Sequence, residues 1–156
     1  MTQELDTALH VFRFELSFQR VAGDGGDDDV CSGAFSECTG LEATMEPKVI
    51  KAGGVNYGAA QRPGPVTFAT VVLKRGMTTN RDLFKWFALV NGTSYAYRLA
   101  AKIDMRDFDG RVVVSWGLDR CLPVKFKAAD LNARNNDVGI EELHLAHEGL
   151  RLLTTP

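Results

Sequence analysis

Polar and hydrophobic residues alternate along several short stretches of the chain, and a period of two is typical of half-buried β-strands. The clearest stretch is residues 10–19, where polar side chains separate Phe12, Phe14, Leu16 and Phe18. Less regular stretches of the same kind are residues 34–38, 41–45, 66–74, 95–103, 111–116, 124–128 and 138–145. We therefore expect about seven or eight strands.

One helix is predicted between residues 79 and 92. Its apolar face has helical spacing and consists of Leu83, Trp86, Phe87 and Val90. Thr79 is placed to cap the start, Asp82 lies at the positive end of the helix, and Asn91-Gly92 ends it. The fold class that follows is mainly β, an antiparallel β-sandwich or barrel with one packed α-helix.

Two turn signals interrupt the strands. Asp109-Gly110 predicts a hairpin turn between residues 95–103 and 111–116. Residues 23–29 are glycines and aspartates, which predict a solvated acidic loop. A calcium site is the alternative for this loop, but the spacing of an EF-hand with its closing glutamate is absent.

Residues 52–65 have a different composition, with one charge, small side chains and no usable periodicity. Loops longer than about 12–15 residues are commonly functional or disordered, and disorder fits poorly because charge is what keeps disordered chains solvated. Either the segment folds back on its own domain or it docks on a neighbouring subunit. The candidate contact residues are Gly53, Gly54, Val55, Asn56, Tyr57, Gly58, Ala59 and Arg62.

Composition fits a single domain over residues 1–156, with 45% hydrophobic and 24% charged residues. A net charge of −2 without a basic stripe argues against nucleic-acid binding. The start of the chain is polar and no apolar stretch is long enough to span a bilayer, so we expect a protein made in the cytosol without a membrane anchor.

The side chains predict no catalytic or metal centre and no cofactor. Cys31, Cys38 and Cys121 match no zinc spacing and are expected to be free thiols. His144 and His147 would point to opposite faces of a strand. The aspartates at residues 104–109 flank the predicted hairpin turn, and the preference of aspartate for turns explains them without a catalytic role. The glycine motifs that bind nucleotides are missing.

Several phrases, taken in order, resemble the T4-type phage tail tube family, which includes the inner-tube proteins of extracellular contractile injection systems. They lie at residues 35–42 (FSECTGLE), 63–64 (PG), 73–76 (LKRG), 82–86 (DLFKW), 116 (W), 123–125 (PVK), 131–133 (LNA), 140–143 (IEEL) and 145–150 (LAHEGL). The acidic loop, which is longer than usual, and His144 depart from the family pattern.

The resemblance implies a non-enzymatic subunit that forms six-membered rings, stacked into a hollow tube that a contracting sheath drives through a target envelope. The implied partners are further copies of the chain, sheath, baseplate, spike and tube-terminating proteins, with room for a cargo in the lumen. It also implies that a loop at about residues 46–65 reaches a neighbouring subunit. Assembly would take place in the bacterial cytoplasm, within a phage tail or a phage-tail-like particle.

Two other interpretations stay open. One is a ring-forming tube or carrier protein of a membrane-anchored secretion system. The other is a small β-barrel binding protein or enzyme, which would need a closed apolar pocket with converging polar groups.

Overall fold

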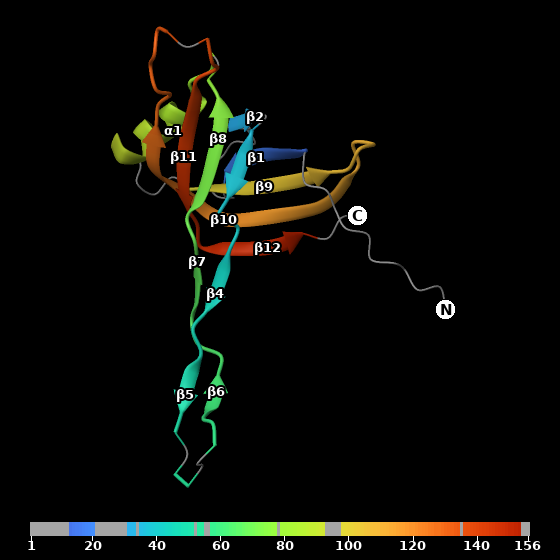
Figure 1. Cartoon of the computed structure of the whole chain (residues 1–156), viewed down its shortest axis with the longest axis vertical. Coiled ribbons are helices and arrows are strands. Elements are labelled where there is room, and N and C mark those ends of the chain that lie inside the picture. Colours follow the sequence, from blue (N-terminus) through green and yellow to red (C-terminus); the bar gives the residue numbers. More distant parts are fainter. Residues whose placement is uncertain are drawn as a thin grey trace.

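The computed structural model describes residues 13–20, 31–33, 35–51, 53–54, 57–77, 79–92, 98–134 and 136–153. Within these ranges the chain forms twelve strands and one helix (Figure 1). They are β1 (Phe14–Arg20), β2 (Cys31–Gly33), β3 (Glu37–Thr39), β4 (Ala43–Met45), β5 (Lys48–Ile50), β6 (Ala60–Arg62), β7 (Val66–Phe68), β8 (Val71–Gly76), α1 (Asp82–Gly92), β9 (Leu99–Arg106), β10 (Val112–Lys127), β11 (Ile140–Ala146) and β12 (Gly149–Leu153).

Two antiparallel sheets share the long strand β10. Its first half lies between β9 and β12, and β9 continues to β1 and β2. Its second half pairs with β11, which continues to β8 and β3. Register shifts interrupt β10 between Leu118 and Cys121 and between Pro123 and Lys125. Such bulges bend a strand, and here the bend carries β10 from one sheet into the other.

The two sheets and α1 enclose one hydrophobic core, and we call this part the body. The helix contributes Leu83, Trp86 and Val90, which are all buried. The Trp86 ring lies 5.2 Å from the Phe18 ring of β1. Most other buried side chains alternate along the strands: Leu16, Val71, Leu73, Leu99, Ala101, Ile103, Leu118, Cys121, Leu143 and Leu145. Burying one large apolar side chain stabilises the fold by about 1.5–3 kcal/mol, so this cluster holds the body together.

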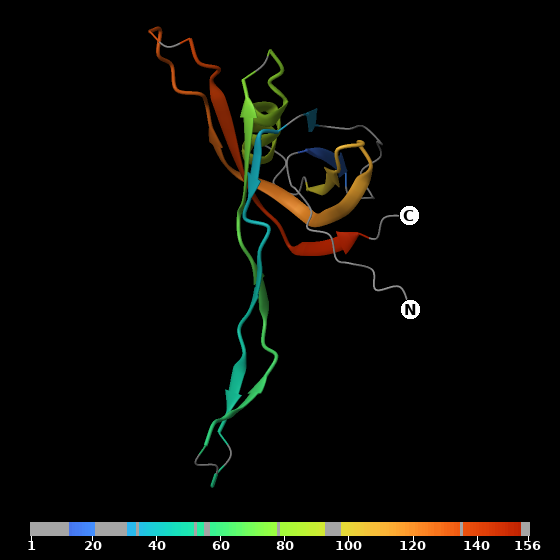
Figure 2. The same ribbon diagram turned by 45° about the vertical axis from the view of Figure 1, so that its right-hand side comes forward.

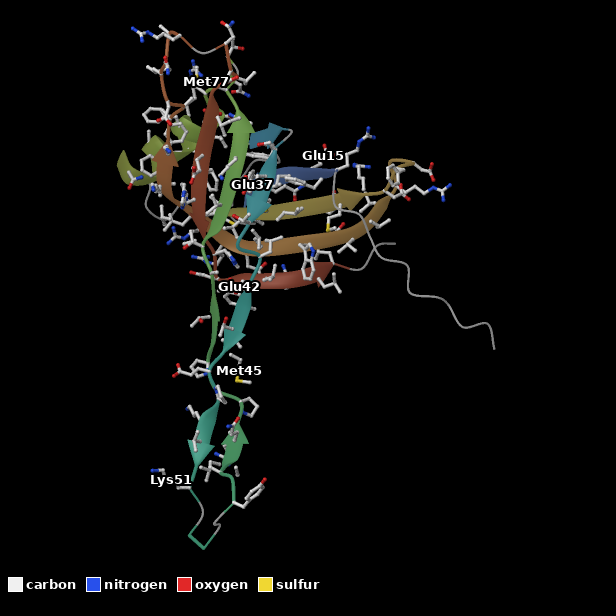
Figure 3. The ribbon with its side chains drawn as sticks, in the orientation of Figure 1. Glu15, Glu37, Glu42, Met45, Lys51 and Met77 are labelled. Carbon is white, nitrogen blue, oxygen red and sulfur yellow. The ribbon has the colours of Figure 1, made fainter. Side chains whose placement is uncertain are left out.

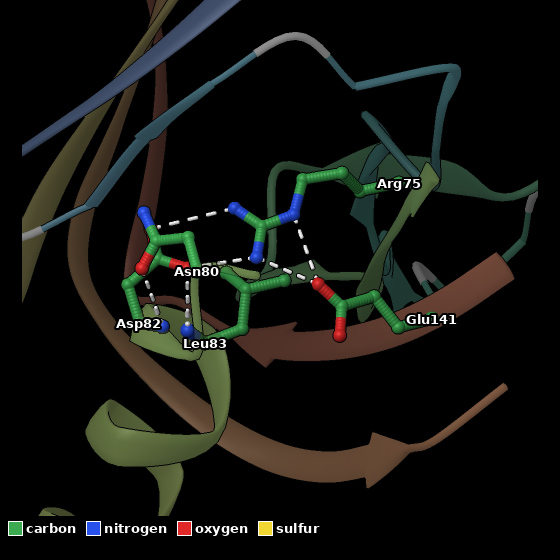
Figure 4. A network of polar contacts seen from close by, with 5 residues as sticks. All are labelled: Arg75, Asn80, Asp82, Leu83 and Glu141. Atoms are coloured by element: carbon green, nitrogen blue, oxygen red, sulfur yellow. Dashed lines mark hydrogen bonds and ion pairs between the residues drawn. The ribbon is translucent and has the colours of Figure 1, made fainter. Parts of the chain in front are cut away.

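A buried ionic network fixes the start of α1 to the sheet (Figure 4). Arg75 on β8 is 4% exposed, and its Nη2 lies 2.6 Å from Glu141 Oε1 on β11 and 2.7 Å from Asp82 Oδ1 on α1. The guanidinium also lies 5.7 Å from the centre of the Phe35 ring. Since charges are costly to bury unless they are paired, this network holds β8, β11 and α1 in one relative position.

The predicted fold class is confirmed, but the cap of the helix is not Thr79. Asn80 Oδ1 accepts a hydrogen bond from the Asp82 backbone N–H at 3.2 Å, and the first helical hydrogen bond joins Lys85 N–H to the Arg81 carbonyl. Asn80 therefore caps the helix in place of Thr79, because its side-chain amide oxygen lies next to the first helical turn. The end of the helix at Gly92 agrees with the sequence.

The strand prediction was wrong in several places. The expected strand at residues 66–74 is divided into β7 and β8, because Ala69 N–H turns to bond the Glu42 carbonyl. The expected strands at 111–116 and 124–128 are one strand, β10, since a bulge accommodates Pro123. A further strand, β12, follows the one at 138–145, so the count of seven or eight was too low. The acidic loop at 23–29 and the start of the expected strand at 95–103 lie outside the described residues.

Candidate functional site

A two-stranded extension projects from the body, and we call residues 43–68 the arm (Figures 1 and 2). Near the body β4 pairs with β7, and farther out β5 pairs with β6. Residues 46–65, expected to be a loop, are therefore largely a hairpin. Sequence reasoning missed this because the ladders are only three residues long and one of their strands, β6, has no alternation of apolar and polar side chains.

Proline and glycine residues explain the joint between the two ladders. Pro47, Pro63 and Pro65 lack an N–H, so a continuous ladder cannot form there. The strands stay together through a hydrogen bond from Glu46 N–H to the Pro65 carbonyl at 3.1 Å. A Cβ on Gly64 would lie 1.8 Å from the Glu46 carbonyl oxygen, so only glycine permits this approach.

Apolar side chains on the arm face solvent. Met45 is 44% exposed, Val49 56% and Val66 51%, and Tyr57 near the tip is 98% exposed. β4, β5 and β6 bury none of their residues, and in Figure 3 their side chains extend away from the ribbon without reaching the body. Several exposed apolar side chains on one segment favour an interaction site over a solvated loop.

The arm carries most of the candidate contact residues that the sequence singled out. Gly53, Gly54, Tyr57, Gly58 and Ala59 lie at its outer end and are exposed. Arg62 is also exposed, but it pairs with Lys48 beside the proline joint, and Val55 and Asn56 are outside the described residues. None of the described ones packs on the body, which removes the interpretation that the segment folds back on its own domain. The sequence missed Met45, Val49 and Ile50, although their apolar character was a usable signal.

The two ends of the molecule differ in charge. Between residues 47 and 65 the arm carries Lys48, Lys51 and Arg62 and no carboxylate. Towards the opposite end, marked by Met77 in Figure 3, a groove of about 700 Å³ lies between β3, β8, β11 and the 128–139 connection. Four carboxylates and two lysines line it: Glu37, Asp130, Asp137, Glu142, Lys74 and Lys127. The groove is therefore net negative where the arm is net positive.

Free strand edges are a second possible contact surface. In the first sheet, β2 and β12 are the outermost strands, and each has one neighbour among the described strands. Leu152 on β12 is 62% exposed. An unpaired edge presents free N–H and C=O groups to another strand, so both edges can accept a second chain.

The titratable residues are explained by local structure. His144 Nε2 lies 2.6 Å from Glu142 Oε1, and this hydrogen bond lowers the pKa of the Glu142 carboxyl. Asp107 Oδ1 accepts hydrogen bonds from the backbone N–H groups of Asp109 and Arg111, and these bonds stabilise the predicted β9–β10 turn. No group of three or more metal-ligating side chains occurs in the described part of the chain.

Two of the expected free thiols are confirmed, at Cys38 and Cys121, and the side chain of Cys31 is outside the described residues. Burial raises the pKa of the Cys38 thiol to about 11 and that of the Cys121 thiol to about 12. Thiols of this kind stay protonated near neutral pH, so neither is an activated nucleophile. No helix in the described ranges combines the length and apolarity needed to cross a membrane.

The geometry defines a mainly β protein with one packed helix and an exposed arm, and comparisons with known proteins show the same fold. The family of T4-like virus tail tube protein gp19 matches residues 10–151. A chain in the structure of the anti-feeding prophage baseplate, 6-fold symmetrised, is 26% identical with a TM-score of 0.80, covering 96% of this chain and 97% of that one. No curated protein matches.

Two further solved structures share the fold. A chain of the PVC sheath-tube complex, from an extracellular contractile injection system in its extended state, is 17% identical with a TM-score of 0.78, covering 97% of this chain and 95% of that one. Hcp1 from Flavobacterium johnsoniae is 12% identical with a TM-score of 0.55, covering 88% and 94%. The chain belongs to the T4-like tail tube family, a family of structural proteins rather than enzymes.

Proposed function

We propose that this chain builds the inner tube of a contractile, phage-tail-like injection apparatus by forming six-membered rings that stack into a hollow conduit. The observation that carries the proposal is the exposed arm, because a free subunit leaves its apolar side chains in water. Family membership supports the tube, and the 6-fold symmetry of the anti-feeding prophage baseplate, in which a similar chain occurs, supports the ring.

Ring closure uses the free edges of the first sheet. β12 of one copy lies beside β2 of the next, which extends the sheet from subunit to subunit. Such a contact joins two different surfaces, and repeated around an axis it closes a ring when the rotation fits. The edges are then paired in the assembly, and a continuous sheet lines the conduit.

Stacking uses the arm. The arm and the acidic groove lie towards opposite ends of the long axis (Figure 1), so the arm of one copy can approach the groove of a copy in the next ring. Lys48, Lys51 and Arg62 then meet the groove carboxylates, and the exposed apolar side chains are covered. Residues 1–156 act in this arrangement as one tail-tube domain whose contact residues include residues 53–59 and Arg62.

The remaining partners follow from this role. A sheath surrounds the tube and drives it through a target envelope on contraction, a baseplate and spike lie at one end, and a terminating protein lies at the other. Chains of similar fold occur in baseplate, sheath-tube and sheath/tube terminator structures, which supports these partners. The subunits assemble in the bacterial cytoplasm.

Deleting residues 53–60 tests the proposal. We expect the variant to fold, because the described deleted residues make no contact with the body. It should elute no larger than a single ring by size-exclusion chromatography and form no tubes in electron micrographs. A matched control replaces residues 53–60 by eight glycine and serine residues, which keeps the arm length but removes Tyr57. Normal tubes from the deletion variant would show that the arm is not the stacking contact.

A further inference from the structure

Two cations stand directly opposite each other on the outer ladder of the arm. Lys48 on β5 pairs with Arg62 on β6, and side chains at opposite positions of an antiparallel ladder lie on the same face. Both are exposed, and neither has an ion-pair partner among the described residues. Like charges at opposite positions destabilise a ladder, and residues 47–65 include no carboxylate, so no anion within the arm offsets this repulsion.

Apolar side chains lie beside these two cations. Because side chains alternate along a strand, Ile50 lies on the same face as Lys48, and its partner Ala60 lies on the same face as Arg62. Ile50 is 38% exposed. We call this surface of four residues the cationic face, and a surface that complements it has carboxylates next to apolar side chains.

Two of the four carboxylates of the acidic groove are already offset by lysines. Glu37 Oε2 lies 3.2 Å from Lys74 Nζ. Glu142 stands opposite Lys127 in the β10–β11 ladder. The excess negative charge of the groove therefore belongs to the other two carboxylates, which lie on the 128–139 connection.

These two are Asp130 and Asp137, and we call them, together with Leu131 and Val138, the rim. Both aspartates are exposed, and neither has a hydrogen-bond or ion-pair partner among the described residues. The apolar residue that follows each is also exposed, Leu131 by 91% and Val138 by 71%. The rim thus combines two unpaired carboxylates with two apolar side chains, which complements the cationic face in charge and in apolar character.

We propose that the cationic face of one copy docks on the rim of a copy in the next ring, with Lys48 and Arg62 paired to Asp130 and Asp137. This assignment rests on the proposed tube and deepens it, because it selects one face of the arm and one pair of groove carboxylates. The arm and the 128–139 connection lie at opposite ends of the long axis (Figures 1 and 2), so a copy does not make this contact with itself.

Complementary charge makes such a contact specific although each ion pair is weak. An exposed ion pair stabilises little by itself, but opposite charges across an interface fix its register, and like charges exclude wrong arrangements. The contact also recurs for every subunit of a ring, so its weak pairs add up between two rings. Reversing the charge of one side should therefore weaken stacking strongly, whereas reversing both sides should restore it.

Charge reversal in the full chain tests the pairing. The arm variant carries Lys48→Glu and Arg62→Glu, and the rim variant carries Asp130→Lys and Asp137→Lys. Each is expected to raise the protein concentration needed for tube formation about tenfold or more, measured by sedimentation, because like charges then face each other. The chain with all four substitutions should form tubes within about threefold of the natural concentration, since residues in contact act as coupled pairs.

The matched control for the arm variant combines Lys85→Glu with Lys125→Glu. It makes the same change in net charge at two exposed lysines of the body, so its assembly should match that of the natural chain. All the substituted side chains are exposed, so every variant should unfold at close to the natural urea concentration.

A carbodiimide joins an amine to a carboxylate that it contacts, and this measurement does not depend on the variants. Tubes are assembled from a mixture of isotopically labelled and unlabelled natural chains. Mass spectrometry should then find Lys48 joined to Asp130 or Asp137 of another copy.

Weak assembly of both reversed variants, restored in the chain with all four substitutions, supports the pairing. The pairing is wrong if the reversed variants form tubes like the natural chain, or if Lys48 is joined only to other carboxylates. The tube proposal is judged separately, because natural tubes that are lost on deletion of residues 53–60 support it whatever the reversals show. If the natural chain forms no tubes, both proposals are contradicted.

Discussion

The body and the arm use hydrophobic residues in opposite ways. In the body, Leu16, Leu73 and Leu143 are fully buried, and the strands that carry them belong to sheets with several members. In the arm, Met45, Val49 and Val66 face solvent on ladders of two strands. The body is therefore stabilised within one chain, whereas the apolar side chains of the arm are exposed, and we propose that another copy covers them.

The two regions also differ in the number of neighbouring strands that complete their backbone hydrogen bonding. Isolated two-stranded ladders are marginally stable in water, and three or more strands with a buried face are usually needed. Among the described residues the arm has no third strand, while β8 and β10 have neighbours on both sides. If the arm docks on another copy as proposed, changes in the body should affect folding and changes in the arm should affect assembly.

The largest effect on folding is expected from Trp86→Ala. Removing a ring that is 1% exposed leaves a cavity, so the free energy of unfolding should fall by about 3–5 kcal/mol in urea denaturation of dilute, unassembled protein. Leu89→Ala, on the same helix but 42% exposed, should change it by less than about 1 kcal/mol. Trp86→Phe gives a graded loss if the alanine variant does not fold. Equal effects at Trp86 and Leu89 would contradict the assigned core.

A somewhat smaller loss is expected from Arg75→Met. It removes the guanidinium that pairs with the buried carboxylates of Asp82 and Glu141, which should lower the free energy of unfolding by about 3 kcal/mol. The matched control is Lys74→Met on the same strand, whose pair with Glu37 is exposed and worth about 0–1 kcal/mol. Adding Glu141→Leu to Arg75→Met should recover part of the loss. If both single variants are equally stable, the buried network does not hold the helix.

A smaller, pH-dependent effect is expected at Cys121. Burial raises the pKa of this thiol from 9.0 to about 12, so the unfolded chain releases the proton above pH 9 while the folded chain keeps it. The contribution of the buried thiol is thus fully present below pH 9 and declines between pH 9 and 12. The stability difference between the natural chain and Cys121→Ala should narrow over that range in urea denaturation. A difference that is independent of pH would contradict the burial of the thiol.

The smallest effect on folding is expected from Tyr57→Ala. The side chain is 98% exposed, so the free energy of unfolding should change by less than about 0.5 kcal/mol. Tyrosine is frequent among the residues that dominate interfaces, and the concentration needed for tube formation should rise about tenfold, measured by sedimentation. Phe108→Ala is the control, because Phe108 is 77% exposed but lies in the β9–β10 turn of the body. If Tyr57→Ala changes the free energy of unfolding but not the concentration needed for tube formation, the arm is not an assembly contact.

Sequence patterns predicted the body better than the arm. Leu83, Trp86 and Val90 are buried as their helical spacing indicated, and the turn at Asp109-Gly110 joins β9 to β10 as expected. These features depend on local periodicity and turn chemistry, which a single sequence contains. The family resemblance, carried by short phrases in order, was confirmed over residues 10–151.

The features that failed depend on contacts between distant residues. The β5–β6 pairing joins residues 48–50 to 60–62, and neither segment alone has a strand pattern. β10 is continuous through Arg120 and Pro123. The sequence around these residues indicates the end of a strand, whereas in the structure two bulges let the strand continue.

Cryo-electron microscopy of purified tubes tests most directly whether the arm completes its packing only against another copy. The expected map has 6-fold symmetry, with Tyr57 and the apolar side chains of β4 and β5 covered by a copy in the adjacent ring. A map in which the arm projects into solvent or the lumen without touching a second copy would contradict the account.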